Sequence, residues 1–406
     1  MVSKYSGKNG RSEKTEANMK NFTHAIPTKL HFGKGVIEKL DESLRPFGKN
    51  VLLTYGGGSI KKIGLYDEVM KILNDGGFNV VECGGIEPNP RIESVERGVK
   101  LCKEHGINVI LAVGGGSTID CSKAIAAGVY YEGDLWQMVE SRHGILPALP
   151  LVDILTLSAT GSEYDGGGVI SNMKLNKKLG NMYTFPSVSL CDPTYTFTVS
   201  AYHTAAGTAD IISHICEEYF SRTEDSDLAD GICETVLKSA IKNLPIALRE
   251  PDNYSARANL MSISSVACSG IPAYGKRDTC WDCHSMEHEL SAYYDITHGV
   301  GLAILTPRWM RHILKKDPTC TWRFVRFAKN VWGLDGENET ELALAGIQKL
   351  EDFFRASGIP MTLSELNIGT EHFEAMAAHA NRGGFLAHAF VALTTEDVVE
   401  IYKACL

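Results

Sequence analysis

The strongest constraint on the fold is a change of hydrophobic period about halfway along the chain. From Asn50 to about Pro193, short apolar runs such as Val51–Tyr55 and Asn108–Val113 alternate with amphipathic stretches of helical spacing. This alternation predicts βαβ units around a parallel sheet, because strands that are buried on both faces are continuously apolar. Beyond Thr198 the strand-like runs stop and long segments of helical period follow. We therefore expect a Rossmann-like α/β N-terminal domain and an all-α C-terminal domain.

The change of period also sets the expected domain boundaries. Residues 1–18 are polar and charged, which predicts a disordered extension and makes Met19 an alternative start. Residues 19–197 are expected to form the α/β domain and residues 198–406 the helical domain. Within the α/β domain, residues Ile60–Asn74 have the spacing of a single amphipathic helix.

Composition and charge limit the partners of this chain. A length of 406 residues with 44% hydrophobic content is enough for two cores. The 40 basic and 49 acidic residues give a net charge of -9, which argues against nucleic acid and anionic membranes and favours a small-molecule partner. No apolar run is long enough to span a bilayer. The cysteines have no regular spacing, so we expect a protein of the reducing cytoplasm.

The first of two glycine-rich loops consists of Gly114, Gly115, Gly116 and Ser117, and it follows the most apolar predicted strand. Glycines let backbone N–H groups approach a pyrophosphate, and the N-terminus of the next helix carries partial positive charge. The loop matches neither the common G-x-G-x-x-G fingerprint nor a P-loop. It is therefore a candidate dinucleotide site, with a tight turn that binds no ligand as the alternative.

The second loop contains Gly56, Gly57 and Ser59 and is followed by Lys61 and Lys62. In nucleotide-binding α/β sheets an acidic residue near this position selects a free ribose hydroxyl, whereas a basic neighbourhood accepts a 2′-phosphate. The absence of a carboxylate here favours NADP(H) over NAD(H). The alternative is a solvated turn with two surface lysines.

Two pairs of side chains have the spacing of metal ligands on a helix. Asp210 and His214 are four residues apart, as are His284 and His288, and His298 follows soon after. Residues at i and i+4 project from one helix face. A carboxylate with several imidazoles suits a divalent ion such as Zn²⁺ or Fe²⁺. Each histidine alone is more often structural, but the combination predicts a metal site.

The motif Cys280-Trp281-Asp282-Cys283 also has the spacing of a zinc or redox site. No second C-x-x-C motif accompanies it, and no βαβ pattern surrounds it. We expect a structural role for these two cysteines.

Together these motifs resemble those of the iron-containing (group III) alcohol dehydrogenase family, in particular its NADP(H)-dependent butanol dehydrogenase branch. The resemblance extends from about Phe22 to the C-terminus. The matching motifs are Pro27-Thr-Lys-Leu-His-Phe-Gly33, Tyr55-Gly-Gly-Gly-Ser-Ile-Lys-Lys62, Ile86-Glu-Pro-Asn-Pro90, Gly114-Gly-Gly-Ser-Thr-Ile-Asp120, Leu155-Thr-Leu-Ser-Ala-Thr-Gly-Ser-Glu163, Asp192-Pro193, and His284-x-x-x-His288 with His298.

The resemblance implies a dehydroquinate synthase-like architecture, a catalytic Fe²⁺ or Zn²⁺ between the domains, NADP(H) as cofactor, and a homodimer or larger assembly. The implied metal ligands are Asp210, His214, His284 and His298. His288 would be a catalytic residue in the proton path near the nicotinamide, and Asp120 is a second catalytic candidate. The loop Gly114–Ser117 would hold the pyrophosphate. The residues implied to approach the nicotinamide end are Asp120, Thr156, Ser158 and Thr160.

Three further positions bear on the cofactor contacts that the resemblance implies. Relatives usually carry an asparagine near the nicotinamide where this chain has Tyr164-Asp165, so Asp165 would place a carboxylate at that cofactor contact. In NAD-preferring relatives an aspartate occupies the position of Gly56. Either Lys177 or Lys178 matches a basic residue that reaches the cofactor.

The expected activity is hydride transfer between NADP(H) and a primary alcohol or its aldehyde, of the butanol and butyraldehyde type. A glycerol or polyol dehydrogenase, or a dehydroquinate synthase-like lyase, is an alternative on the same architecture. A dinucleotide-binding protein without turnover is an alternative from another class, as is a structural protein held by zinc at Cys280 and Cys283.

Overall fold

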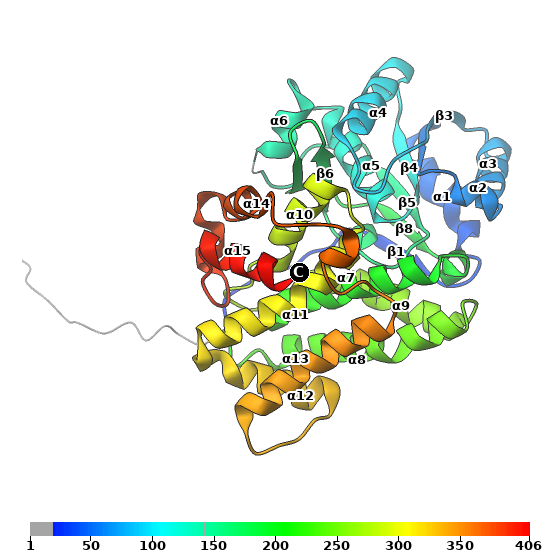
Figure 1. Cartoon of the computed structure of the whole chain (residues 1–406). Coiled ribbons are helices and arrows are strands. Elements are labelled where there is room, and N and C mark those ends of the chain that lie inside the picture. Colours follow the sequence, from blue (N-terminus) through cyan, green and yellow to red (C-terminus); the bar gives the residue numbers. More distant parts are fainter. Residues whose placement is uncertain (1–18, 142) are drawn as a thin grey trace, which may run out of the picture.

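A six-stranded parallel sheet forms the centre of the N-terminal half, as the alternating pattern predicts (Figure 1). The computed structural model describes residues 19–141 and 143–406, so the extension expected at residues 1–18 lies outside the described residues. Neighbouring strands follow the order β1-β8-β5-β4-β2-β3, and each pair is parallel. The strands are β1 (Lys29–Phe32), β2 (Asn50–Tyr55), β3 (Asn79–Cys83), β4 (Val109–Gly114), β5 (Leu151–Leu155) and β8 (Val188–Cys191).

Helices cover both faces of this sheet because its side chains alternate between two apolar cores. On β2, Leu52 packs into the core that contains residues of α4 and α5. Its neighbours Val51 and Leu53 pack into the core that contains residues of α1 and α3. All three are fully buried, which explains the continuous apolar run of this strand. The helices of this half are α1 (Leu40–Leu44), α2 (Ser59–Lys62), α3 (Leu65–Asp75), α4 (Ile92–His105), α5 (Gly116–Gly128) and α6 (Leu135–Glu140).

The order of the strands places both glycine loops at a topological switch point. Strands β2 and β4 are neighbours, with Tyr55 beside Val113, while β3 and β5 lie on opposite sides of them. The chain therefore leaves β2 and β4 in opposite directions across the sheet. In open α/β sheets, ligands bind at the carboxyl ends of two such strands. The loops after Tyr55 and after Val113 both lie at that edge.

Three elements of the α/β half differ from the expectation. Strand β1 precedes the region in which strands were expected. The single helix expected over Ile60–Asn74 is wrong, because Gly64 adopts a left-handed conformation with φ 78° and separates α2 from α3. A two-stranded antiparallel hairpin, β6 (Gly167–Asn172) and β7 (Lys177–Met182), was not expected, since its glycines and lysines form no apolar run.

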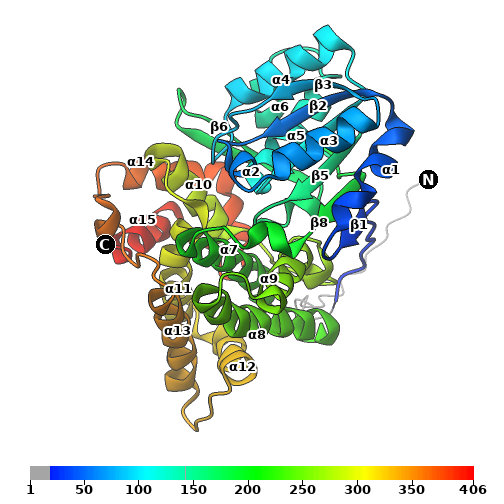
Figure 2. The same cartoon turned by 90° about the vertical axis from the view of Figure 1, so that its right-hand side faces the viewer.

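The C-terminal half consists of helices, as expected, and shares one large apolar core (Figures 1 and 2). None of the helices among the described residues is long and apolar enough to cross a membrane. The α-helices are α7 (Ala201–Tyr219), α8 (Asp227–Arg249), α9 (Tyr254–Ala267), α10 (Asp282–Tyr294), α11 (His298–Lys316), α12 (Thr321–Trp332), α13 (Glu339–Ala356), α14 (Phe373–Ala380) and α15 (Thr395–Ala404). Short 3-10 segments are η1 (Val36–Lys39), η2 (Arg45–Phe47), η3 (Ser162–Tyr164), η4 (Pro193–Thr196), η5 (Ile271–Ala273), η6 (Pro318–Cys320), η7 (Ser364–Leu366) and η8 (Arg382–His388).

Candidate metal centre and cofactor cleft

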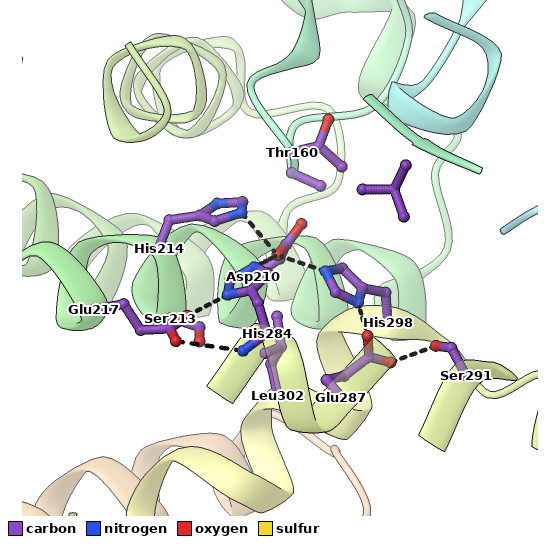
Figure 3. Close-up of polar contacts among 12 residues, drawn as sticks. Thr160, Asp210, Ser213, His214, Glu217, His284, Glu287, Ser291, His298 and Leu302 are labelled. Atoms are coloured by element: carbon purple, nitrogen blue, oxygen red, sulfur yellow. Dashed lines mark hydrogen bonds and ion pairs between the residues drawn. The ribbon is translucent and has the colours of Figure 1, made fainter. Parts of the chain in front are cut away.

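Three helices of the C-terminal half bring the predicted metal-binding side chains to one point. Asp210 and His214 come from α7, His284 and His288 from α10, and His298 is the first residue of α11. Figure 3 shows His214, His284 and His298 arranged around the Asp210 carboxylate. Two segments that are distant in the sequence thus form a single cluster.

One carboxylate oxygen is the centre of this cluster. The Oδ1 atom of Asp210 lies 3.4 Å from Nε2 of His214, 3.6 Å from Nε2 of His284 and 3.6 Å from Nε2 of His298. Ligand atoms of Asp210, His284 and His298 all lie within 4.8 Å of one another. The His214 ring stacks on that of His284, with centroids 4.6 Å apart. A divalent cation can bridge ligands at such separations.

The bonding of these atoms fits a cation. Asp210 Oδ1 and His284 Nε2 are buried and have no hydrogen-bond partner within residues 19–141 and 143–406. Buried polar atoms are nearly always satisfied in folded proteins, so two such atoms that face one another need an additional partner. A carboxylate oxygen and imidazole nitrogens are the donor set that Zn²⁺ and Fe²⁺ accept. Asp210, His214, His284 and His298 can therefore hold a divalent ion.

The electrostatics of the cluster favour an anionic Asp210. Burial alone would raise its pKa, but the surrounding imidazoles, His214 first and then His298, hold the pKa well below its usual range. Burial lowers the pKa of His214 to about 3. In His284 burial acts in the same direction, but Glu217 and Asp210 outweigh it and raise the pKa to about 9.

Two buried glutamates, which the sequence analysis did not identify, orient the imidazoles. Nδ1 of His284 is hydrogen-bonded to Glu217, and Nδ1 of His298 to Glu287, so each Nε2 faces Asp210 (Figure 3). Glu217 also accepts a hydrogen bond from the backbone N–H of Cys283 at 2.6 Å. Carboxylates in this position fix the tautomer and ring orientation of metal-ligating histidines. Glu217 lies two helical turns after Asp210 on α7. This spacing puts both side chains on the same face of the helix and could have identified Glu217 from the sequence.

The hairpin places the two candidate lysines in different surroundings. Lys177 is paired with Glu140 at 2.6 Å on the outside. Lys178 is buried, and its Nζ lies 3.2 Å from Glu287 Oε2 and 3.0 Å from Ser291 Oγ on α10. Residues alternate between the two faces of a strand, so only one of two adjacent lysines can face α10. Lys178 thus connects the α/β half to the carboxylate that holds His298.

Glu287→Gln is expected to weaken cation binding about 10- to 100-fold, the usual cost of removing a carboxylate behind a ligating histidine. The amide keeps the shape of Glu287 but loses the charge that supports His298 and pairs with Lys178. Competition titration with a chelator measures the dissociation constant. The exposed Glu374→Gln on α14 is the control. A dissociation constant within twofold of the wild type would remove the role assigned to Glu287.

A cleft of about 780 Å³ opens beside this cluster. Nine of the sequence-predicted residues line it: Ser117, Asp120, Thr160, Asp165, Lys178, His214, His284, His288 and His298. The cleft is large enough for a small substrate together with part of a dinucleotide. Its lining comes from both halves of the chain, so the cluster faces a space that the first glycine loop also reaches.

The other predicted cofactor residues lie outside the lining of this cleft. Gly114, Gly115 and Gly116 connect β4 to the N-terminus of α5, whose first N–H groups have no intrahelical acceptor. A Cβ at Gly116 would lie 2.2 Å from Thr160 Oγ1, so only glycine permits this approach. Gly56, Gly57, Ser59 and Thr156 follow the ends of β2 and β5 at the same edge of the sheet. The Ser158 carbonyl instead packs against Gly207 on α7.

The carboxylates of Asp120 and Asp165 have internal partners. Asp120 accepts hydrogen bonds from Ser162 Oγ at 2.5 Å and from the Val169 N–H at 2.9 Å. Asp165 forms an ion pair of 2.8 Å with Lys123, which is fully buried on α5. Lys123, which lies one helical turn after Asp120, therefore balances the charge of Asp165 within the protein. Burial raises the pKa of Asp120 to about 6.

His288 and the C-x-x-C motif complete the surroundings of the cluster. His288 lines the cleft with its ring 5.7 Å from that of His298, and burial, followed by Lys178, lowers its pKa well below the usual range. Cys280 and Cys283 are both buried, and Cys280 Sγ lies 3.7 Å from the Phe385 carbonyl oxygen. Neither takes part in the groups of potential metal ligands found in the described chain.

Comparisons with known proteins identify the family to which the chain is related. Residues 27–193 match the model of the family described as iron-containing alcohol dehydrogenase, and residues 204–406 match its C-terminal counterpart. The chain is 50% identical to NADH-dependent butanol dehydrogenase A of Clostridium acetobutylicum, covering 95% of this chain and 99% of that protein. It is 36% identical to the NADPH-dependent aldehyde reductase YqhD of Escherichia coli, covering 86% and 90%.

Solved structures share the whole fold. The crystal structure of NADH-dependent butanol dehydrogenase A from Thermotoga maritima matches with a TM-score of 0.90 at 39% identity, covering 96% of this chain and 99% of that chain. The structure of Escherichia coli YqhD matches with a TM-score of 0.91 at 33% identity, covering 96% and 100%. The family models together span most of the chain, and several relatives exceed 30% identity over nearly its full length. The chain belongs to the iron-containing alcohol dehydrogenase family.

Proposed function

We propose that this protein is an NADP(H)-dependent alcohol dehydrogenase that transfers hydride between the nicotinamide and a primary alcohol or its aldehyde, with butanol and butyraldehyde as representative substrates. The observation that carries the proposal is the cluster around Asp210 Oδ1, which faces a cleft that Ser117 and Thr160 also line. A cluster of potential metal ligands beside a loop that can hold a dinucleotide is the arrangement that metal-assisted hydride transfer requires.

In this proposal each part of the cleft has a chemical role. When bound, a divalent cation supplies Lewis acidity and a nicotinamide dinucleotide supplies or accepts hydride. Asp210, His214, His284 and His298 hold the cation, and Glu217 and Glu287 keep the imidazoles oriented. His288 accepts the hydroxyl proton of an alcohol at a ring nitrogen and returns it to the product of aldehyde reduction.

The remaining wall of the cleft excludes water from the reacting atoms. Trp281 and Phe385 line it on the side of the helical half, and Leu179 and Met182 of the hairpin line it opposite. The apolar surfaces of these side chains provide contact for the alkyl chain of a primary alcohol.

The preference for NADP(H) rests on the loop after β2. Glu82, the carboxylate nearest to it on β3, accepts hydrogen bonds from the hydroxyls of Tyr55 at 2.6 Å and Tyr66 at 2.9 Å. Lys61 Nζ lies 4.4 Å from the centroid of the Tyr66 ring. Glu82 is thus already hydrogen-bonded to two tyrosines, and Lys61 is the charged group near the loop that could attract a ribose 2′-phosphate.

Initial rates of butyraldehyde reduction with NADPH and NADH test both parts of the proposal. We expect kcat/KM to be about tenfold or more higher with NADPH than with NADH. Gly56→Asp should reduce kcat/KM with NADPH about 10- to 100-fold, because the new carboxylate would repel the 2′-phosphate. Gly56→Asn is the control, since it adds a side chain of nearly the same size, with the same approach of 3.2 Å from Cβ to the Ile86 carbonyl oxygen, but without the charge. A preference of the wild type for NADH would reverse the cofactor assignment. A lack of turnover with both nucleotides would reject the activity.

A further inference from the structure

The mouth of the cleft is formed in part by a late segment that carries none of the family motifs described above. Helix α14 ends at Ala380, and η8 (Arg382–His388) follows with two left-handed glycines, Gly383 and Gly384. His379, Arg382 and Phe385 of this segment line the same cleft as the histidine cluster. A charged side chain from this segment therefore faces the substrate space.

Arg382 is a cation without an ion-pair partner in the described chain, although its charge acts on the nearby carboxylates of Glu140 and Glu289. None of the ion pairs within residues 19–141 and 143–406 includes it, and its side chain is exposed to the cleft. The other charged side chains of the lining are engaged. They are Asp120 with Ser162 and Val169, Glu140 with Lys177, Asp165 with Lys123, Lys178 with Glu287, and Glu289 with His379.

A chain of two hydrogen bonds holds Arg382 in place. Glu289, which is 2% exposed and follows His288 on α10, lies with Oε1 2.6 Å from His379 Nδ1. A proton on Nδ1 leaves Nε2 of His379 as an acceptor, and Arg382 Nη1 lies 3.3 Å from it. The guanidinium is thereby fixed to the helix that carries two histidines of the cluster. Its other N–H groups remain available to a ligand.

This inference rests on the proposed function. The contacts of Arg382 bear on which chemical group the substrate carries at the end opposite its aldehyde. We propose that Arg382 binds an anionic group at the distal end of the aldehyde, so that the enzyme accepts short aldehydes that end in a carboxylate. A guanidinium matches a carboxylate with two parallel N–H···O bonds. The cleft volume of about 780 Å³ exceeds the need of an unbranched four-carbon chain.

The test compares two four-carbon aldehydes, butyraldehyde and 4-oxobutanoate, with the metal-loaded full chain at saturating nucleotide. We expect Arg382→Gln to lower kcat/KM for 4-oxobutanoate about 10- to 100-fold, mainly through KM, because a hydrogen bond to a charged group is lost. The value for butyraldehyde should stay within about twofold. Arg382→Lys should recover part of the loss, since it keeps the charge but not the paired geometry. Arg355→Gln, at an exposed arginine of α13, is the matched control.

Three results would overturn the inference. The first is a wild type that reduces butyraldehyde but not 4-oxobutanoate. The second is an equal loss for both aldehydes in Arg382→Gln, which would make the arginine structural. The third is a raised KM for the nucleotide with unchanged values for both aldehydes, which would assign the guanidinium to a cofactor phosphate. A wild type that turns over neither aldehyde with either nucleotide would instead refute the proposed activity itself.

Discussion

Asp210→Ala is expected to remove the divalent cation and to lower kcat/KM for aldehyde reduction on the order of 10³-fold or more, since Lewis acidity is worth several kcal/mol. Asp210 Oδ1 is the atom that the imidazoles of His214, His284 and His298 share, at 3.4, 3.6 and 3.6 Å. Without it the site loses its only anionic donor among these four residues. Elemental analysis after anaerobic desalting and steady-state kinetics on the same sample measure both effects.

The exposed Asp252→Ala provides the control for Asp210→Ala, because it removes the same side chain on the surface. It should retain the cation content and the turnover of the wild type. Circular dichroism should show the same helix content in both variants. If Asp210→Ala kept a full equivalent of metal together with wild-type turnover, the metal site would lie elsewhere and the proposed chemistry would fail.

Gly299→Ala is expected to destabilise the protein by about 1–3 kcal/mol or more and to weaken cation binding at the same time. A Cβ at this position would lie 1.9 Å from the Ala206 carbonyl oxygen of α7, which is a backbone atom and cannot turn aside. The methyl group would push the first turn of α11 away from α7. His298 would then move away from Asp210, which lies one turn beyond Ala206.

Denaturant unfolding and chelator competition measure the two consequences of Gly299→Ala. Gly231→Ala on α8 is the matched control, since nothing lies within 4 Å of a Cβ there. Replacement of a helical glycine by alanine in open space should stabilise the protein by up to about 1 kcal/mol and leave cation binding unchanged. Equal stability and equal metal affinity in the two variants would show that the approach of α7 and α11 does not control the site.

The sequence was sufficient for features that depend on local periodicity. The continuous apolar runs of β2 and β4 predicted a parallel sheet, because both faces of these strands are covered. The spacing of Asp210 and His214 predicted that they share one face of a helix, and α7 contains both. The same reasoning missed the hairpin of β6 and β7, whose strands lack an apolar run, and joined α2 to α3 across Gly64.

The class of fold, the place of the glycine loops after two strands and the candidate metal ligands could be predicted from the sequence, since each follows from residue type and short-range spacing. Which side chains meet depends instead on three-dimensional packing. The packing of α11 on α7 brings His298 to Asp210, the hairpin turns Lys178 and not Lys177 toward α10, and Lys123 balances Asp165. These are contacts between distant segments, and their geometry is set by how whole helices and strands pack, which no local pattern contains.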